Sequence, residues 1–346
     1  MEEQRMLKGP GPLLDPNGSL ADLGWARQPL LDSNLEAINI YSTFKFWQRF
    51  RLKRWDYYAV TTPTHFFSFT LGDIGYLGQV FAYAIEFASG RVHEETLTIP
   101  LSKGIWLPRN STEGDSFFDN GTVSLRFQAL PGERKIAVNW PGFDGAGLKA
   151  EFSLALAQEH ESTVIVIPMP NRRFYYNRKI NCMPASGWVE HLGQRHALEP
   201  QTCLGNLDWG RGIWEYNSFW VWASASGFLA DRRTIGLNLG FGFGDTSAAT
   251  ENTLIVNGRV HKLGKVDFSY NSPNYSAPWH MTSADGRLDL TFTPFLERLA
   301  KTDFVLLSSE VHQMFGRYSG TAVLDSGEKI TISELTGFAE EHHARW

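Results

Sequence analysis

The residues with the clearest chemical potential lie in one short segment, from Asp208 to Trp214. It places a carboxylate, the Arg211 guanidinium and two indoles, those of Trp209 and Trp214, close together in the chain. A carboxylate near aromatic walls is a candidate general acid or base, because burial raises its pKa and a neighbouring cation lowers it. The glycines at 205–212 predict a loop. We expect Asp208 and Arg211 to be catalytic; the alternative is a salt bridge between them that pins the loop.

Further aromatic and polar residues follow this segment. Trp220 and Trp222 lie two residues apart, which is the spacing of neighbours on one face of a strand. From Gly236 to Gly244 glycines alternate with apolar residues, so one face of the predicted strand is bare except for Asn238. A bare face admits a ligand, or rings from a neighbouring strand. Glu251 is a second candidate acid, with turn capping as the alternative.

The C-terminal region adds a third polar group. His312 is a further catalytic candidate, and Gln313, Glu340 and His343 are candidate substrate-binding residues together with Asn238 and the four tryptophans. Histidines near carboxylates can bind zinc, but the spacing here matches no zinc signature, so we expect no metal. The chain has neither a nucleophile elbow nor a phosphate-binding loop, and no cofactor is expected.

Composition narrows the function classes. The net charge is −5, from 32 Lys and Arg against 37 Asp and Glu, and only residues 45–54 form a basic run. That run is expected to be a solvated face, with an anionic surface as the alternative, and nothing else favours nucleic acid. Aromatic residues reach 14%, with 12 Trp and 24 Phe, which favours a thick β core with some rings lining a pocket for a ring-bearing, lipidic or sugar ligand.

Cysteine usage and hydropathy bear on location. Cys182 and Cys203 form no metal-binding pair, and a reducing compartment is the simpler interpretation, although a disulfide between them is an alternative. The first residues lack the apolar core of a signal peptide, and no apolar run is long enough for a membrane span. We therefore expect a cytoplasmic protein; the sequence carries no signal for an oligomeric state.

Most of the chain after Trp55 alternates with period two, which predicts β-strands. Strand candidates recur about every ten residues between turns such as Asn257-Gly258, a spacing typical of a sandwich or barrel. They are 66–71, 80–87, 96–101, 123–127, 135–140, 148–156, 218–225, 233–243, 253–256, 259–263, 286–292, 304–311, 318–324 and 329–332. Leu35 to Phe50 is the best candidate for a helix or an irregular turn.

The two halves of the chain resemble each other faintly. Trp55-Asp56-Tyr57 and Trp214-Glu215-Tyr216 each precede an aromatic strand and then a glycine-punctuated one. This predicts a mostly β protein of two pseudo-duplicated, lipocalin-like antiparallel barrels or sandwiches, with few helices. We expect an extended arm at 1–40, a first domain at 41–180 and a second at 181–346, joined through 157–185.

From about Trp55 to Trp346 the chain resembles the family called domain of unknown function 2804. The motifs that carry the resemblance are Cys182-Met183-Pro184-Ala185-Ser186-Gly187, Asp208-Trp209-Gly210-Arg211-Gly212-x-Trp214, Trp220-x-Trp222-Ala223-Ser224, Gly236-Leu237-Asn238-Leu239-Gly240, Thr250-Glu251-Asn252, His312-Gln313-x-Phe315-Gly316 and Gly337-x-x-Glu340 with Arg345-Trp346. The doubled barrel is more loosely similar to carotenoid hydratase-like and tocopherol cyclase-like proteins of the lipocalin-related group. That resemblance implies acid–base hydration or cyclisation of a lipophilic substrate without a cofactor.

Together these features predict a hydratase, isomerase or cyclase that acts on a lipophilic or ring-bearing small molecule. Asp208 or Glu251 would move the proton, and Arg211, with Asn238, Gln313 and His312, would orient the substrate or stabilise charge. The tryptophans would form walls and stabilise a cationic intermediate. One alternative is a binding protein that carries a lipid, pigment or sugar; another is a structural protein with a solid core.

Overall fold

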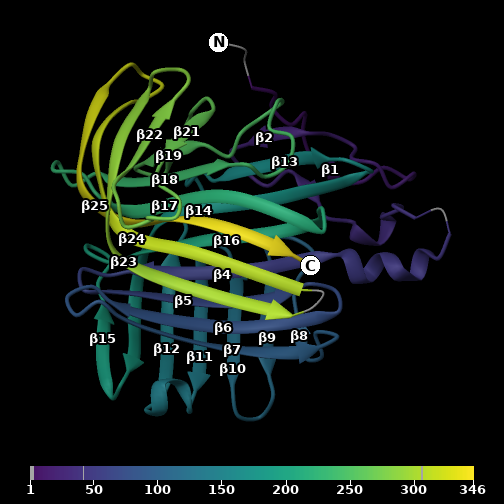
Figure 1. The fold of residues 1–346 in the computed structure, drawn as a ribbon, viewed down its shortest axis with the longest axis horizontal. Helices are drawn as coiled ribbons and strands as arrows, with labels where there is room; N and C mark the ends of the chain where they lie inside the picture. Colours follow the sequence, from purple (N-terminus) through teal and green to yellow (C-terminus); the bar gives the residue numbers. More distant parts are fainter. Residues whose placement is uncertain (1–3, 42, 305–306) are drawn as a thin grey trace.

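The computed structural model describes residues 4–41, 43–304 and 307–346. It is mostly β, with 61% strand and 4% helix, so the predicted fold class is confirmed. The helical segments are three 3-10 helices: η1 (Leu35–Ala37), η2 (Lys45–Arg51) and η3 (Phe143–Gly145). Two curled antiparallel sheets form the body (Figure 1). A short parallel pair, β1 (Gly11–Pro12) with β3 (Leu31–Asp32), lies in the N-terminal region.

The first sheet has fourteen strands. They are β2 (Gly24–Ala26), β4 (Lys53–Thr61), β5 (His65–Asp73), β6 (Leu77–Glu86), β7 (Arg91–Pro100), β8 (Ile105–Trp106), β9 (Gly114–Asp119), β10 (Ser124–Leu130), β11 (Glu133–Trp140), β12 (Leu148–Ala155), β13 (Thr163–Met169), β14 (Arg173–His191), β15 (Gln194–Leu198) and β16 (Leu204–Ile213). The spatial order is β7-β6-β5-β4-β16-β14-β12-β11-β10-β9-β8, with β13 and β15 paired to β14 and β2 paired to β13.

The second sheet has nine strands in the order β20-β19-β18-β17-β25-β24-β23-β22-β21. They are β17 (Asn217–Phe228), β18 (Thr234–Phe241), β19 (Thr253–Val256), β20 (Arg259–Lys262), β21 (Val266–Ser269), β22 (Trp279–Ser283), β23 (Leu288–Phe304), β24 (Leu307–Val323) and β25 (Lys329–Arg345). Within the described residues no helix is long and apolar enough to cross a membrane.

Both sheets follow one plan, consistent with a pseudo-duplicated barrel fold. If the short β2 is set aside, the first strand of each half pairs with the last: β4 with β16, and β17 with β25. From that central pair a meander of four strands runs outward on one side, β4 to β7 in the first half and β17 to β20 in the second. The remaining strands return in order on the other side. The repeat is therefore one of topology.

The structure differs from the expectations in one segment and in the division of the chain. The glycine-rich segment around Asp208 is a strand and not a loop, because its backbone pairs with β4 on one edge and β14 on the other. Its glycines make room for close neighbours: a Cβ on Gly210 would lie 2.2 Å from the Trp55 ring. The sheets divide the chain at residues 214–216, whereas the expected domain boundary at residue 180 falls inside β14. Within the expected joining segment, 157–185, residues 163–169 and 173–185 are strands of the first sheet, so the segment is part of the first half.

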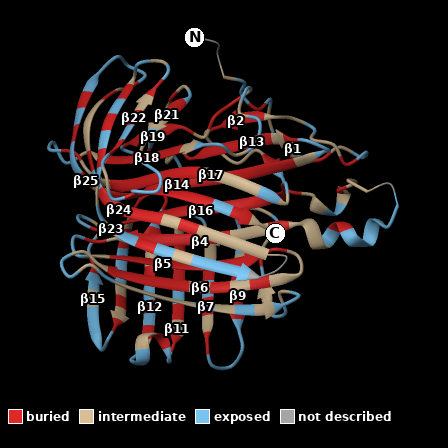
Figure 2. Cartoon of the chain, viewed as in Figure 1, coloured by how far each residue is buried: buried red, intermediate tan, exposed pale blue. Residues whose placement is uncertain are grey.

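Three buried layers follow from the alternation of side chains along the strands. The first sheet curls around one core, which includes Tyr58, Tyr176 and Trp209, and the second around another, which includes Val221 and Met314. Between them lies a third buried region, which we call the seam, formed by the opposite faces of the same strands. The central strands are therefore buried on both faces (Figure 2). Both cysteines are buried and unpaired.

The N-terminal residues tie the two halves together. The backbone amide of Arg5 donates to the carbonyl of Ala248, and the Gln4 side chain donates to the carbonyl of Leu263. Further along, β2 adds to the first sheet through β13. At a bulge in β14 the Asn181 side chain donates to the Ser224 hydroxyl of β17 at 2.9 Å. The contacts of Gln4, Arg5 and Asn181 join the two halves, whereas β2 extends the first sheet.

A buried ion pair lies inside the first half. The Arg211 side chain has no exposed surface, and its Nη1 lies 2.9 Å from Asp56 Oδ1. The same guanidinium donates to the carbonyls of Trp55 and Pro108, and Asp56 also accepts a hydrogen bond from the Ser116 hydroxyl. Loss of one partner would leave the other charge buried without compensation.

We expect Arg211→Met to lower the free energy of unfolding by about 3–5 kcal/mol, because Asp56 would then be a buried, uncompensated carboxylate. Urea denaturation monitored by circular dichroism measures this. The double variant Asp56→Leu with Arg211→Met should recover part of the loss, since both charges are removed. A loss below about 1 kcal/mol in Arg211→Met would contradict a stabilising role for the pair.

Candidate active site in the seam

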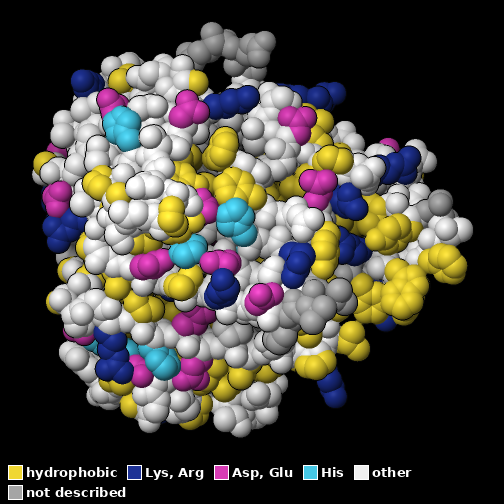
Figure 3. Space-filling view, viewed as in Figure 1, with side chains coloured by type: hydrophobic (Ala, Val, Ile, Leu, Met, Phe, Trp, Pro, Cys, Tyr) yellow, Lys and Arg dark blue, Asp and Glu magenta, His cyan; other side chains and the backbone are white. Residues whose placement is uncertain are grey.

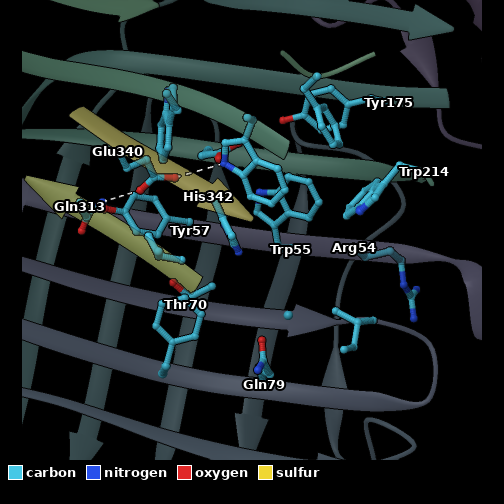
Figure 4. Close-up of a pocket in the computed structure, with 18 of the residues that line it drawn as sticks. Arg54, Trp55, Tyr57, Thr70, Gln79, Tyr175, Trp214, Gln313, Glu340 and His342 are labelled. Atoms are coloured by element: carbon cyan, nitrogen blue, oxygen red, sulfur yellow. Dashed lines mark hydrogen bonds between the residues drawn. The ribbon is translucent and has the colours of Figure 1, made fainter. Parts of the chain in front are cut away.

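A cavity of about 210 Å³ lies in the seam between the two halves. Strands β4, β5, β6, β14 and β16 of the first sheet and β17, β23, β24 and β25 of the second contribute to its walls. Figure 4 shows Glu340 and His342 entering from β25, opposite side chains of the first sheet such as Thr70. The cavity is thus built only when the halves are packed together, and it is separate from both barrel cores.

Aromatic side chains form most of the cavity wall. Trp55, Tyr175 and Trp214 make one group, with ring centroids 5.2 Å apart for the two tryptophans and a stacked Trp55–Tyr175 pair at 5.7 Å. Trp220 and Trp222 project from β17 on the opposite side. Trp222 makes edge-to-face contacts with the rings of Tyr57 and Phe338. Such walls favour an apolar, ring-bearing ligand.

Glu340 is the carboxyl group most strongly affected by this environment. Its Oε1 accepts a hydrogen bond from the Trp220 indole at 3.2 Å, and its Oε2 accepts one from the Gln313 amide at 2.9 Å. Burial raises the pKa of Glu340 to about 7, although the Arg298 charge opposes the shift. Both protein partners are neutral donors and cannot accept a proton. The protonated Glu340 carboxyl group can therefore donate its O–H to a molecule in the cavity.

Gln313 is held in the orientation that this contact needs. Its Oε1 accepts from Arg298 Nη1 at 3.2 Å, which turns its amide group toward Glu340. Arg298 is in turn paired with Glu94 of β7 at 2.7 Å and lies over the Tyr83 ring. The chain Glu94–Arg298–Gln313–Glu340 therefore spans both sheets and fixes the carboxyl group in place.

His342 lies two residues beyond Glu340 on the same face of β25. Burial lowers the pKa of His342 to about 3, and the Arg298 charge adds to the shift. The ring is therefore neutral near pH 7, with Nε2 at 2.8 Å from the Ser309 hydroxyl and the ring 4.0 Å from that of Trp220. It can exchange hydrogen bonds with a ligand without adding charge.

A second polar group lies across the cavity. Lys179 Nζ is 2.8 Å from Asp208 Oδ2 and 3.9 Å from Glu251 Oε2, and it lies 3.7 Å from the centre of the Trp222 ring. Asp208 also accepts from the Asn177 amide at 2.6 Å. One ammonium thus joins two carboxylates against an indole face, an arrangement suited to stabilising charge in a bound molecule.

Asn238 positions this group from behind. Its Oδ1 accepts from the Trp222 indole at 2.7 Å, and its Nδ2 donates to Glu251 Oε2 at 3.0 Å. A Cβ on Gly240 would lie 2.2 Å from Glu251 Oε1, so the bare face of the glycine-rich strand is occupied by this acid. This face was predicted to admit a ligand or rings from a neighbouring strand; at Gly240 it packs the Glu251 side chain instead.

Three lining side chains carry buried polar atoms with no partner in the described protein. They are the hydroxyl of Thr70 and the indole N–H groups of Trp214 and Trp346. Unsatisfied buried donors cost stability unless a ligand or water meets them. All three atoms are therefore available to a bound molecule; those of Thr70 and Trp214 lie on the first-sheet side of the cavity, and that of Trp346 follows β25.

The structure brings together seven of the twelve residues predicted for the site. Those lining the cavity are Asp208, Glu251, Trp214, Trp220, Trp222, Gln313 and Glu340. Asn238 does not line the cavity but hydrogen-bonds to two residues that do, Trp222 and Glu251. Trp209 and Arg211 face the first core, because residues one and three positions from Asp208 lie on the other face of β16. The alternative for these residues, a salt bridge between Asp208 and Arg211, is not formed either: Asp208 pairs with Lys179 and Arg211 with Asp56.

His312 and His343 also lie outside the cavity lining. His312 stacks on Tyr275 and pairs with Glu297 at 2.6 Å, away from the seam. His343 is exposed and contacts Glu341 at 2.9 Å. On a strand they alternate with the cavity residues Gln313 and His342, which explains the offset of one position.

Lys179, His342, Arg298 and Tyr57 line the cavity but were not among the predicted site residues. His342 had a detectable signal, since it shares a strand face with Glu340. Lys179 lies in the run Asn177-Arg178-Lys179, whose adjacent members face different layers: Asn177 and Lys179 contact Asp208, whereas Arg178 contacts Ser111. Among the residues that the structure describes, no three His, Cys, Asp or Glu side chains are grouped so that they could hold a metal ion.

Comparison with solved structures finds several that are similar to this chain. CghA aligns with a TM-score of 0.52 and 10% identity, covering 85% of this chain and 88% of CghA. Kievitone hydratase from Nectria haematococca aligns at 0.49 and 10% identity, covering 85% and 88%, respectively. A putative AttH from Nitrosomonas europaea aligns at 0.49 and 12%, covering 85% and 93%. The CghA likeness shows the fold alone.

Sequence comparison is more specific. No curated protein matches the chain. The profile of a family described as "Domain of unknown function (DUF2804)" matches residues 4–346, as the ordered motifs predict. The chain therefore belongs to the DUF2804 family.

Proposed function

We propose that the protein is an acid–base enzyme of the hydratase, isomerase or cyclase type, acting on an apolar, ring-bearing small molecule in the seam. The observation that carries the proposal is Glu340, a buried carboxyl group whose pKa burial raises to about 7 within an aromatic cavity. A general acid works best when its pKa lies near the working pH. Asp208 and Glu251 keep a role in the proposal: they lie beside Lys179, where they can stabilise charge on the substrate.

The proposed reaction begins with proton transfer from Glu340 to the substrate. The positive charge that this creates is stabilised by the indole of Trp220 and by the two carboxylates around Lys179. Water, or a nucleophile within the substrate, then forms the new bond and loses a proton. That proton returns to the Glu340 carboxylate, which restores the enzyme without any redox change.

A carrier function is the second candidate. It is favoured by the internal pairing of the cavity's charges: Lys179 with Asp208, and Arg298 with Glu94. A carrier needs only apolar walls and a few polar contacts, which Thr70 and Trp214 supply. The two functions differ in one respect, because only the enzyme moves protons to and from its ligand.

We expect wild-type protein in D₂O to place deuterium on members of a panel of aromatic enones and cyclic olefins, with benzylideneacetone as the reference compound. Mass spectrometry of the recovered compounds measures this. Exchange should be constant below about pH 7 and fall about tenfold per unit above it, because Glu340 must be protonated. Glu340→Gln should reduce exchange by about 100-fold or more.

Glu341→Gln is the matched control for this experiment. Glu341 is the next residue of β25 but faces the second core, where Tyr275 donates to it at 2.6 Å. Its substitution should leave exchange unchanged. Binding of the panel, seen as quenching of tryptophan fluorescence, with no exchange by wild-type protein would favour the carrier.

The raised pKa of Glu340 also predicts a pH-dependent stability that needs no substrate. The folded carboxyl group holds its proton up to about pH 7, whereas the unfolded one loses it near its ordinary pKa of 4.5. Between those values the folded state binds more protons, so its stability falls as pH rises. Relative to wild type, Glu340→Gln should therefore gain about 3 kcal/mol in unfolding free energy between pH 4 and pH 8.

Urea denaturation across this pH range checks the prediction, and Glu341→Gln supplies a control of opposite sign. Burial alone would raise the pKa of Glu341, but hydrogen bonds from Tyr270, Tyr275 and His343 outweigh it and lower the pKa. The unfolding free energy of wild type should therefore rise relative to that of Glu341→Gln as the pH rises through the acid range. A parallel response of the two variants would show that Glu340 is not an unusual acid.

A further inference from the structure

An exposed aromatic and basic segment, residues 44–51, projects from the molecule just before β4. Phe44, Phe46 and Trp47 are 79%, 60% and 58% exposed, respectively. Figure 1 shows η2 standing away from both sheets, and Figure 3 shows hydrophobic and basic side chains gathered on that projection. Contiguous exposed apolar side chains of this size mark a surface for interaction.

The segment holds its rings outward by a defined set of contacts. Gln48 is its buried residue: its side chain accepts from the Ile40 amide at 2.6 Å and donates to the Ile38 carbonyl at 3.0 Å. The rings pack mainly on one another, with Phe46 and Trp47 centroids 5.8 Å apart, and the Arg49 guanidinium lies 3.8 Å from the Phe46 ring. One polar anchor thus presents an aromatic and cationic tip.

The charge of this region is opposite to that of the whole chain. Between Glu36 and Asp56 there is no acid, and the cations are Lys45, Arg49, Arg51, Lys53 and Arg54. Lys53 is buried and Arg54 pairs with Asp73, whereas Lys45 and Arg49 are exposed. A protein of net charge −5 therefore presents a positive tip, which complements an anionic surface.

The segment also adjoins the cavity. Lys53 Nζ donates to the Ile74 carbonyl at 2.8 Å, and a Cβ on Gly75 would lie 2.5 Å from the Phe50 carbonyl. Ile74 lines the cavity, as do Arg54 and Trp55 at the start of β4. On the next turn Leu101, which is 65% exposed, donates its amide to the Tyr76 carbonyl. Exposed apolar side chains thus lie beside the turn at residues 74–76, whose Ile74 lines the cavity.

We infer that residues 44–51 dock the protein on an anionic lipid surface. Phe44, Phe46 and Trp47 enter the headgroup layer, where aromatic side chains are favoured, and Lys45, Arg49 and Arg51 meet lipid phosphates. Docking places the adjoining cavity edge against the lipid, from which an apolar ligand can enter without crossing water. The docking itself depends on the segment alone and holds whether or not the cavity is catalytic.

Flotation of the full-length protein with unilamellar vesicles tests this inference. We expect binding to vesicles of phosphatidylcholine with about one-third phosphatidylserine, and little binding to pure phosphatidylcholine. Lys45→Gln with Arg49→Gln and Arg51→Gln should weaken binding on the order of 100-fold, since each cation near an anionic surface contributes about fivefold. Phe44→Ser with Phe46→Ser and Trp47→Ser should abolish flotation.

A matched control removes exposed side chains elsewhere. Leu192→Ser with Arg195→Ala changes the β14–β15 turn, on the opposite side of the molecule in Figure 1, and should leave vesicle binding intact. The charge variant keeps every ring, so it stays informative if the serine variant unfolds. Equal binding by wild type and the charge variant would overturn the inference. So would a wild-type dimer, in sedimentation, that the serine variant converts to monomer, because a second copy would then cover the segment.

Discussion

The packing of the two half-barrels against each other is the constraint on which the rest of the structure depends. It buries both faces of the central strands, so adjacent residues of one strand pack in different layers. On β25, for example, Ala339 packs in the second core while Glu340 faces the seam. A charged side chain that points into the seam is taken out of bulk water, so it is stabilised by a partner there.

That requirement accounts for the electrostatics of the cavity. Lys179 and Arg298 are each held by carboxylates, whereas Glu340 contacts neutral donors and is the acid whose pKa rises. Glu341, the next residue, has a lowered pKa, because tyrosine hydroxyls and His343 hydrogen-bond to it on the other face of the strand. Adjacent glutamates with opposite shifts show that the layer a side chain enters, rather than its place in the sequence, sets its acidity.

Sequence periodicity predicted the fold well and the site in part, for the same physical reason. Strands with one solvated face, such as β12, alternate clearly and were identified. Where both faces are buried, as in β16, the alternation vanishes and the glycines favour a loop. Because the segment was interpreted as a loop, Asp208 and Arg211 were expected to lie in one site, whereas on a strand they point to opposite faces. Lys179 and Arg298 carried no local signal, since their roles arise from strands that are distant in sequence.

The duplicated topology places two carboxylates in corresponding positions. Asp208 lies on β16, opposite Tyr57 of β4, and Glu340 lies on β25, opposite Trp222 of β17. Each acid is thus on the last strand of its half, beside an aromatic residue of the first, and both line the cavity. Their surroundings differ, because Asp208 is paired with an ammonium and Glu340 with an indole and an amide. Two related carboxylates in unlike environments can take different parts in one proton-transfer reaction, and here a duplicated scaffold supplies both.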